Sequence, residues 1–200
     1  LAKDARDEPR MAATALALGF PADYLEYLPR AAAGARAGRE VRSGGWWYAG
    51  SGWMQPAGLV AAQLAAARAR GGLVLHLNAS VQALKRTELG WRALAADGAV
   101  IAAAPVVVLA NSHDAARLVP LATALKSVRG QLSCFPADNL ALPRAVLAGA
   151  GHLVPLADGT GVTGATYDFD DDDPVPSAEG HAGNLERLEQ LLPDVAARID

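Results

Sequence analysis

The segment with the most evident chemical potential is a run of aromatic and glycine residues at positions 43–56. It reads Ser-Gly-Gly-Trp-Trp-Tyr-Ala-Gly-Ser-Gly-Trp-Met-Gln-Pro, so that glycines are interleaved with Trp46, Trp47, Tyr48 and Trp53. Glycine permits tight turns and a close approach of the backbone to other groups. Aromatic rings can line a ligand pocket or stack on a nucleobase, and they also fill hydrophobic cores. The sequence leaves both interpretations open.

A second group of residues is suited to anionic ligands. Arg129 can bind a carboxylate through two parallel hydrogen bonds, although an arginine in a strand or turn more often binds backbone groups. Tyr167 can line a substrate pocket or pack at its rim. Arg36, Arg39 and Arg42 form a small basic cluster that could contact phosphate, with a solvated surface loop as the alternative.

Other reactive residue types do not form a convincing site. Ser112-His113-Asp114 has the residues of a hydrolase triad, but neighbours in sequence seldom converge in space. The histidines lack metal-ligand spacing, and the acidic run 168–173 lacks the glycine and distal glutamate of a calcium loop. We predict no metal site. Cys134, the single cysteine, excludes an intrachain disulfide and is expected to be a buried thiol, which fits a cytoplasmic location.

The composition predicts a globular protein that does not enter a membrane. The chain has 200 residues, of which 52% are hydrophobic, and a formal net charge of -3. This charge gives no global attraction for a polyanion, so any RNA contact must come from local groups or other domains. The longest apolar stretch, 99–110, is shorter than the ~20 residues that span a bilayer and is interrupted by Pro105.

The elements that must position these residues can be predicted from apolar periodicity and turn residues. In the first 120 residues we predict helices at 9–18, 21–28, 56–70 and 112–118, and a Gly/Ala/Arg connection at 30–42. In the same part we predict strands at 73–77, 81–85, 91–95, 100–103 and 105–109.

The rest of the chain changes character. Short apolar segments separated by loops predict antiparallel strands at 127–135, 145–147, 152–156 and 161–167. An amphipathic helix should begin near Ser177 and end at Pro193, and Val195 can open another. The fold class is therefore mixed α/β, although a Gly-x-Gly-x-x-Gly fingerprint for a dinucleotide is absent.

Several short motifs, taken in order, resemble the D-amino-acid-oxidase superfamily. They are Gly44-Gly45-Trp46-Trp47-Tyr48, Ser51 to Pro56, Val106 to Asn111, Val128-Arg129-Gly130-Gln131 and Gly164-Ala165-Thr166-Tyr167. Within that superfamily the chain is most similar to the oxidoreductase domain of bifunctional tRNA 5-methylaminomethyl-2-thiouridine biosynthesis enzymes. Leu1 in place of an initiator methionine, and an end without a helix stop, fit an internal fragment.

The resemblance implies FAD as cofactor and FAD/NAD(P)-binding-like segments interleaved with an antiparallel-sheet substrate domain. It assigns 1–55 to a substrate or lid region, 56–119 to the central FAD-binding domain, 120–176 to the substrate-domain sheet and 177–200 to its helical segment. Val81, Ala110 and Asn111 would contact the cofactor, while Trp53, Arg129 and Tyr167 would contact the substrate. No catalytic acid or base is identified.

The implied reaction is oxidative removal of the carboxymethyl group from 5-carboxymethylaminomethyluridine at the tRNA wobble position. Hydride would pass to the flavin, and hydrolysis of the imine would release glyoxylate. The implied partners are tRNA and a methyltransferase domain in the same polypeptide. Two alternatives remain, namely a glycine, sarcosine or D-amino-acid oxidase and a noncatalytic interaction domain on the same scaffold.

Overall fold

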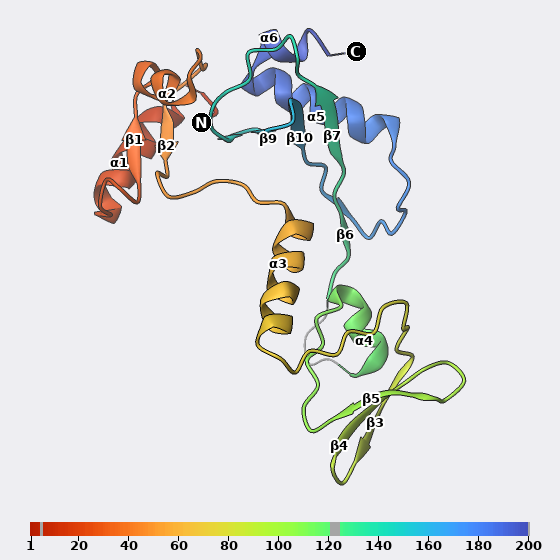
Figure 1. Ribbon diagram of the computed structural model, residues 1–200. Coiled ribbons are helices and arrows are strands. Elements are labelled where there is room, and N and C mark those ends of the chain that lie inside the picture. Colours follow the sequence, from red (N-terminus) through yellow and green to blue (C-terminus); the bar gives the residue numbers. More distant parts are fainter. Residues whose placement is uncertain (5, 121–124, 200) are drawn as a thin grey trace. The chain divides into compact units, whose positions relative to one another are not determined.

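The structure is a computed structural model that describes residues 1–4, 6–120 and 125–199 (Figure 1). The chain divides into two compact units. Unit 1 combines Leu1–Met54 with Val128–Asp200, and unit 2 is Gln55–Ser127. Helices and antiparallel strands occur in both units, so the prediction of a mixed α/β protein is confirmed.

The first part of unit 1 contains two helices and a two-stranded sheet. These are α1 (Asp7–Leu18), β1 (Glu26–Leu28), α2 (Arg30–Ala37) and β2 (Gly45–Trp47). β1 and β2 are antiparallel, and Tyr27 pairs with Trp46. Gly44 lies where an added Cβ would be 2.6 Å from the Leu28 carbonyl oxygen. The glycines before the tryptophans therefore permit close packing of these strands.

Two predictions for this region are wrong. The segment 21–28 is not a helix. The amides of Tyr24 and Leu25 donate to the Pro21 carbonyl oxygen in a turn, and residues 26–28 form β1. Its apolar spacing suited a helix, but pairing with a distant strand prevailed. The connection expected at 30–42 contains α2 instead. Alanine is the strongest helix former, and Gly38 ends the helix at a φ of +73° with its amide bonded to Ala35.

The second part of unit 1 is an antiparallel sheet covered by helices, as predicted. The sheet order is β7-β10-β9-β8, and a separate pair joins β11 to β6. The strands are β6 (Val128–Arg129), β7 (Leu132–Pro136), β8 (Leu147–Ala148), β9 (His152–Pro155), β10 (Thr160–Gly164) and β11 (Asp168–Phe169). The helices are α5 (Ala178–Leu191), whose N-cap Ser177 accepts a hydrogen bond from the Gly180 amide, and α6 (Pro193–Ala196).

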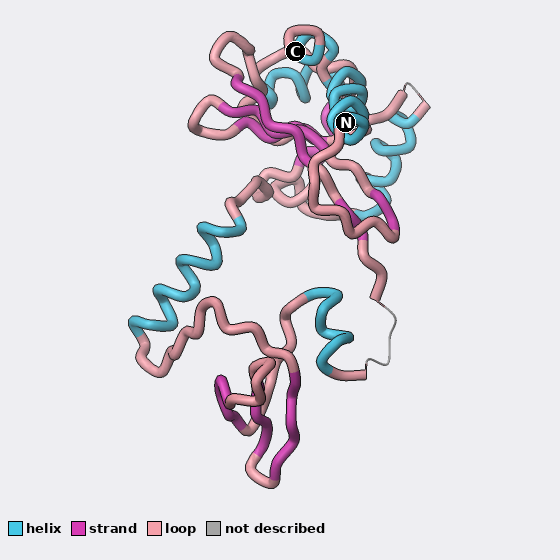
Figure 2. The backbone as a smooth tube through the Cα atoms, turned by 90° about the vertical axis from the view of Figure 1, so that its right-hand side faces the viewer, coloured by secondary structure: helices cyan, strands magenta, loops and turns pink. Residues whose placement is uncertain are grey.

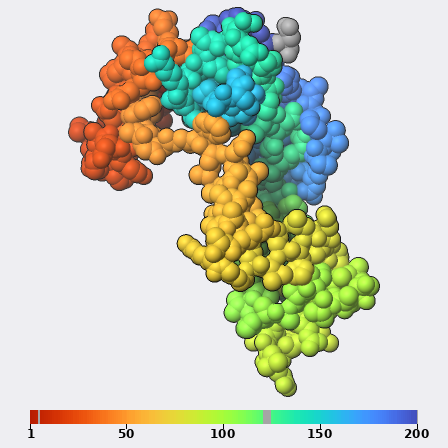
Figure 3. All heavy atoms as spheres, viewed as in Figure 1, coloured from red at the N-terminus to blue at the C-terminus, as the bar shows by residue number. Residues whose placement is uncertain are grey.

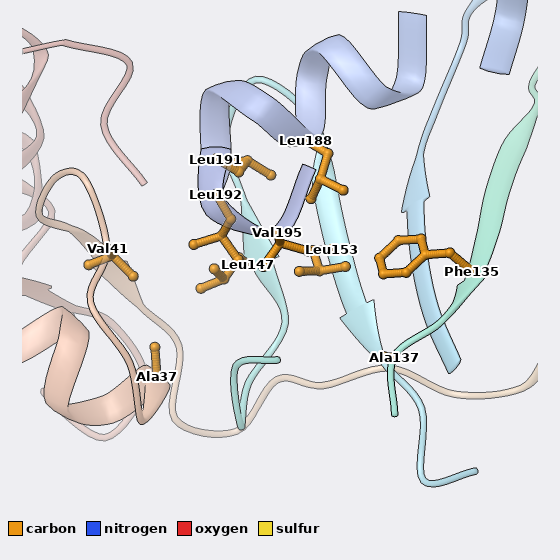
Figure 4. Close-up of a cluster of buried hydrophobic side chains, with 10 residues drawn as sticks. All are labelled: Ala37, Val41, Phe135, Ala137, Leu147, Leu153, Leu188, Leu191, Leu192 and Val195. Carbon is orange, nitrogen blue, oxygen red and sulfur yellow. The ribbon is translucent and has the colours of Figure 1, made fainter. Parts of the chain in front are cut away.

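The core of unit 1 lies between this sheet and the last two helices. Leu153 and Leu188 are fully buried, and Leu192 and Val195 are nearly so. Figure 4 shows these side chains pointing toward one another, with Ala37 of α2 at the edge of the cluster. Burial of such side chains stabilises a fold by roughly 1.5–3 kcal/mol each. The core thus fixes the sheet β7-β10-β9-β8, and Arg129 lies in β6, directly before β7 in the sequence.

Unit 2 contains a helix, a three-stranded sheet and a short helical turn, visible in the tube of Figure 2. Its elements are α3 (Pro56–Ala69), β3 (Ala83–Thr87), β4 (Gly90–Leu94), β5 (Val100–Ala104), η1 (Ser112–Asp114) and α4 (Ala115–Leu118). The predicted hairpin around Asp97-Gly98 is confirmed, since β4 pairs with β5. Among the described residues of unit 2, only Ala115 is buried.

The strands predicted at 73–77 and 105–109 do not form. Both segments lack ladder partners among the described residues, and Val74 and Val108 are 77% and 83% exposed. An apolar run indicates a preference for burial, but a strand also needs a neighbouring strand to receive its hydrogen bonds. Local sequence cannot supply that partner.

The unit boundaries differ from the segments assigned by resemblance. Unit 2 ends at Ser127, whereas the predicted flavin-domain segment ended at 119, and residues 121–124 of the predicted sheet segment lie outside the described residues. The functional assignment of these segments stays a prediction. In the described part of the chain, the helices are too short or too polar to cross a bilayer.

Candidate functional site: two cavities

A cavity of about 540 Å³ in unit 2 brings together the three residues predicted to contact the cofactor. Val81 lies two residues before β3, while Ala110 and Asn111 follow the segment 105–109. The antiparallel strands β3, β4 and β5 lie between these two parts of the wall in the sequence. The next residue, Ser112, has a left-handed backbone with φ of +55°, which makes a sharp turn into η1. We call this cavity the hairpin cavity.

Polar and apolar groups contribute about equally to the wall of the hairpin cavity, which is close to neutral. Its charged lining residues are Asp114 and Arg117, whose side chains form an ion pair of 3.3 Å with each other. Small side chains at Ala79, Ala93 and Ala110 leave the backbone accessible. Such a wall suits a flat, uncharged ring better than a pyrophosphate, because none of its described lining residues is an unpaired cation. The residues present therefore fit the adenosine part of a dinucleotide.

A second cavity, of about 620 Å³, lies in unit 1 and is lined by the aromatic segment. Trp46, Trp47, Tyr48 and Trp53 all contribute to its wall. The segment that carries them is at the surface, in orange in Figure 3. We call this space the aromatic cavity. Trp46 and Trp47 are half-buried, which fits rings that fill a core, whereas Tyr48 and Trp53 are 39% and 44% exposed, which fits rings that line a pocket.

Local contacts fix the aromatic cavity. The indole N–H of Trp46 donates to the Met11 carbonyl oxygen at 2.9 Å, which ties β2 to α1. The guanidinium of Arg36 lies 5.6 Å from the ring centroid of Trp47, within the range of a cation–π contact. The lining also includes Arg144, whose backbone amide donates to the Ala37 carbonyl oxygen at 2.8 Å.

Gly38 makes room for the Arg144 side chain. An added Cβ at Gly38 would lie 2.8 Å from Cδ and 2.9 Å from Nε of Arg144. The φ of +73° is a conformation that side-chain-bearing residues seldom adopt. The glycine that ends α2 thus also allows an arginine to reach the aromatic cavity from a distant part of the sequence.

Arg129 is held by its own chain. Its guanidinium donates to the carbonyl oxygens of Asp173 and Val175, each at 2.6 Å, and to Gln131 Oε1 at 3.2 Å. It also lies 3.5 Å from a carboxylate oxygen of Asp168 and 3.6 Å from one of Asp171, and its side chain is only 14% exposed. The structural role that the sequence left open is therefore present, and a substrate carboxylate would have to compete with these partners.

The predicted substrate residues do not share one cavity. Trp53 lines the aromatic cavity, whereas neither Arg129 nor Tyr167 does. Tyr167 is 69% exposed and makes an edge-on contact with Phe169, with ring centroids 5.1 Å apart. It precedes β11, where Asp168 pairs with Arg129. Tyr167 and Arg129 are therefore neighbours, and the substrate role of all three residues stays a prediction.

Two other expectations concern reactive side chains. Cys134 is exposed, which corrects the prediction of a buried thiol. Burial along β7 alternates, and Cys134 lies on its outward face between the buried Ser133 and Phe135. Among the described residues, no group of three or more histidine, cysteine or acidic side chains is placed to hold a metal ion.

Sequence reasoning missed part of both cavity walls. Arg144 gave no signal, because nothing in its local sequence relates it to tryptophans some ninety positions earlier. Asp114 and Arg117 are three residues apart on a helical turn, so their ion pair could have been read from the spacing. Their place in the hairpin cavity depends on the turn at Ser112, which the sequence did not reveal.

Comparison with known proteins gives one consistent family. A family model described as FAD dependent oxidoreductase matches residues 1–200. The "tRNA 5-methylaminomethyl-2-thiouridine biosynthesis bifunctional protein MnmC" of Ralstonia nicotianae is 44% identical over 206 residues, which cover 100% of this chain and 31% of that protein. The protein of the same name from Burkholderia pseudomallei is 45% identical over 200 residues, covering 98% of this chain and 30% of that protein.

A solved structure shares the fold. The crystal structure of glycine oxidase from Geobacillus kaustophilus superimposes with a TM-score of 0.78 and 25% sequence identity. The superposition covers 98% of this chain and 53% of the glycine oxidase chain. This chain therefore spans about half of that oxidase and about 30% of the curated relatives.

Proposed function

The chain belongs to the family of FAD-dependent oxidoreductases, and from this premise we propose that it is part of a tRNA wobble-uridine oxidase. The complete protein would remove the carboxymethyl group from 5-carboxymethylaminomethyl-(2-thio)uridine and leave 5-aminomethyl-(2-thio)uridine. One observation carries the proposal, namely the 44% identity along the whole chain to a relative named for biosynthesis of this modification.

Unit 2 would contribute to the flavin site. Val81, Ala110 and Asn111 line one neutral cavity, which supports their proposed contact with the adenosine part of FAD. When bound, FAD supplies the hydride acceptor for oxidation of the amine. The task left to this chain is to hold the substrate amine in position and exclude water. Unit 1 would serve as the substrate domain, with Trp53, Arg129 and Tyr167 as candidate contacts.

The proposed partners follow from the relatives. Their name describes a bifunctional protein, and this chain spans 31% of the length of the Ralstonia relative. We propose that a methyltransferase domain lies in the same polypeptide and that tRNA is the substrate. A cytoplasmic location would give such an enzyme access to tRNA.

A second candidate function has support from one observation. The similarity to glycine oxidase, at a TM-score of 0.78, fits an oxidase of glycine, sarcosine or a D-amino acid. A noncatalytic interaction domain on the same scaffold is the third alternative. The three differ in whether a flavin is bound and in which amine reduces it.

The test is an anaerobic titration of the purified complete protein. Under the proposal, the protein contains oxidised flavin, and tRNA carrying the carboxymethylaminomethyl group bleaches its visible absorbance. The matched control is the same tRNA without that group, which should leave the spectrum unchanged. Bleaching by glycine or a D-amino acid alone would favour the second candidate, and absence of flavin would refute both oxidase functions.

The flavin contact can be tested by filling the hairpin cavity. Ala110→Leu adds three carbon atoms to its wall, and we expect flavin affinity to fall about tenfold or more, equivalent to ~1.4 kcal/mol. Ala103→Leu is the matched control, because Ala103 is exposed on β5 outside the wall. The measurement is flavin content per protein after dialysis. Equal loss in both variants, or in neither, would contradict the placement.

A further inference from the structure

The rings around the aromatic cavity are not part of the main core of unit 1. That core is built from aliphatic side chains and Phe135, and it includes none of the four tryptophans. Trp53 lines the cavity and is 44% exposed, so a large part of its ring is open to contact. Trp47 also faces the cavity. The two rings therefore present aromatic surface that a ligand can cover.

The charges around the aromatic cavity favour an anion. Arg144 is the only residue of its lining with a charged side chain, and the lining contains no aspartate or glutamate among the described residues. Arg36 adds a second guanidinium beside Trp47. Neither Arg36 nor Arg144 forms a salt bridge with another described residue. Arginine is well suited to phosphate because its planar guanidinium can donate two parallel hydrogen bonds.

A ligand that matches these walls combines a flat ring with a phosphate. The volume of about 620 Å³ lies within the range of small-molecule sites, roughly 300–1,000 Å³, and can admit a nucleotide. Proteins recognise unpaired RNA bases by stacking them on aromatic side chains and contacting the adjoining phosphate with arginine. A free amino acid offers no ring-and-phosphate combination of this kind.

We propose that the aromatic cavity binds one nucleotide of a single-stranded RNA segment. The base would lie against Trp47 and Trp53, and Arg144, assisted by Arg36, would contact the phosphate. This inference rests on the proposed function, because the RNA would be the anticodon loop of the tRNA substrate. Under this proposal, a chain of net charge -3 binds a polyanion through a local group of arginine and aromatic side chains.

The experiment measures binding of a fluorescein-labelled anticodon stem-loop to the complete flavin-containing protein. Fluorescence anisotropy gives Kd at several KCl concentrations. For Arg144→Gln we expect weaker binding and a slope of log Kd against log salt that is smaller by about 1, because one phosphate contact is lost. For Trp47→Leu we expect Kd to rise about tenfold with the slope unchanged, because stacking is lost while charge is kept.

Unit 2 offers a matched control pair. The guanidinium of Arg86 lies 5.3 Å from the ring centroid of Trp91, an arginine–tryptophan contact like that of Arg36 and Trp47, but outside both cavity walls described above. Arg86→Gln and Trp91→Leu should keep the Kd and the salt slope of the unaltered protein. Circular dichroism checks folding, and Arg144→Gln remains informative if Trp47→Leu does not fold, since Arg144 is exposed.

The outcomes separate this inference from the proposed function. If the unaltered protein binds the stem-loop but Arg144→Gln and Trp47→Leu bind it equally well, the cavity is not an RNA site and the inference is overturned. A cavity that serves a protein partner would give this result. The same loss in the control pair would also overturn it. If tRNA neither binds nor reduces the flavin of the unaltered protein, the proposed function itself fails.

Discussion

Replacing Arg129 by glutamine separates its structural role from its predicted role in substrate binding. The guanidinium makes two hydrogen bonds of 2.6 Å, to the carbonyl oxygens of Asp173 and Val175, and lies beside Asp168 and Asp171. A hydrogen bond to a charged group contributes about 1.5–3 kcal/mol, and water can reach the released carbonyls, so we expect Arg129→Gln to lower the free energy of unfolding by about 2–4 kcal/mol.

The assay is urea unfolding followed by tryptophan fluorescence. Trp46, Trp47 and Trp53 belong to unit 1, so the signal reports mainly on the unit that contains Arg129. Arg10→Gln is the control, because the Arg10 side chain is 77% exposed and its ion pair with Asp7 has i,i+3 spacing in a helix, for which we expect a much smaller loss than for Arg129→Gln. A normal urea midpoint for Arg129→Gln, together with a raised KM for the substrate, would refute the structural role.

Three further predictions concern stability. Leu188→Ala should lower the free energy of unfolding by about 2–5 kcal/mol in the same urea assay, because Leu188 is fully buried, and a loss below ~1 kcal/mol would contradict its place in the core. Ser177→Ala removes the N-cap of α5 and should cost about 1 kcal/mol, measured likewise against Ser177→Asn, which should restore the cap. Burial and the hydrogen bond to Glu8 raise the pKa of Tyr27 in the folded protein, so ionisation of Tyr27 favours unfolding. The stability that Tyr27 adds is fully present below the pKa of an exposed tyrosine and is lost as pH rises through the raised pKa. In an ultraviolet titration, the tyrosine that ionises at the higher pH should be missing from Tyr27→Phe.

Much of the fold followed from local sequence where local forces decide. Helix α3 begins at Pro56, and the hairpin at Asp97-Gly98 forms as expected, because a proline at the first helical turn and a glycine turn act within a few residues. Helix α2 was missed because residues 30–42 were interpreted as a Gly/Ala/Arg connection, although alanine itself favours a helix. The strands expected at 73–77 and 105–109 failed because ladder partners are not encoded locally.

The site was predictable to a lesser degree. Val81, Ala110 and Asn111 came from resemblance alone, and their shared cavity is a consequence of the intervening hairpin. Arg144 could not be found, because its approach to the tryptophans depends on packing against Gly38. Pairing between distant segments is a tertiary property, and one sequence contains no direct signal for it.

The division of unit 1 into two stretches of chain has a consequence for how the protein folds during synthesis. Residues 55–127, which is 73 residues, must be made before the second stretch of unit 1 appears. Closing a flexible loop of that length costs about 4 kcal/mol of entropy by the (3/2)RT ln n relation, apart from a constant. Unit 2 is continuous in sequence, but among its described residues only Ala115 is buried, so it contributes little core of its own during this interval. Until α5 and α6 arrive, the N-terminal stretch lacks the core that Leu188, Leu192 and Val195 supply, so it is the part that chaperones and proteases would meet first.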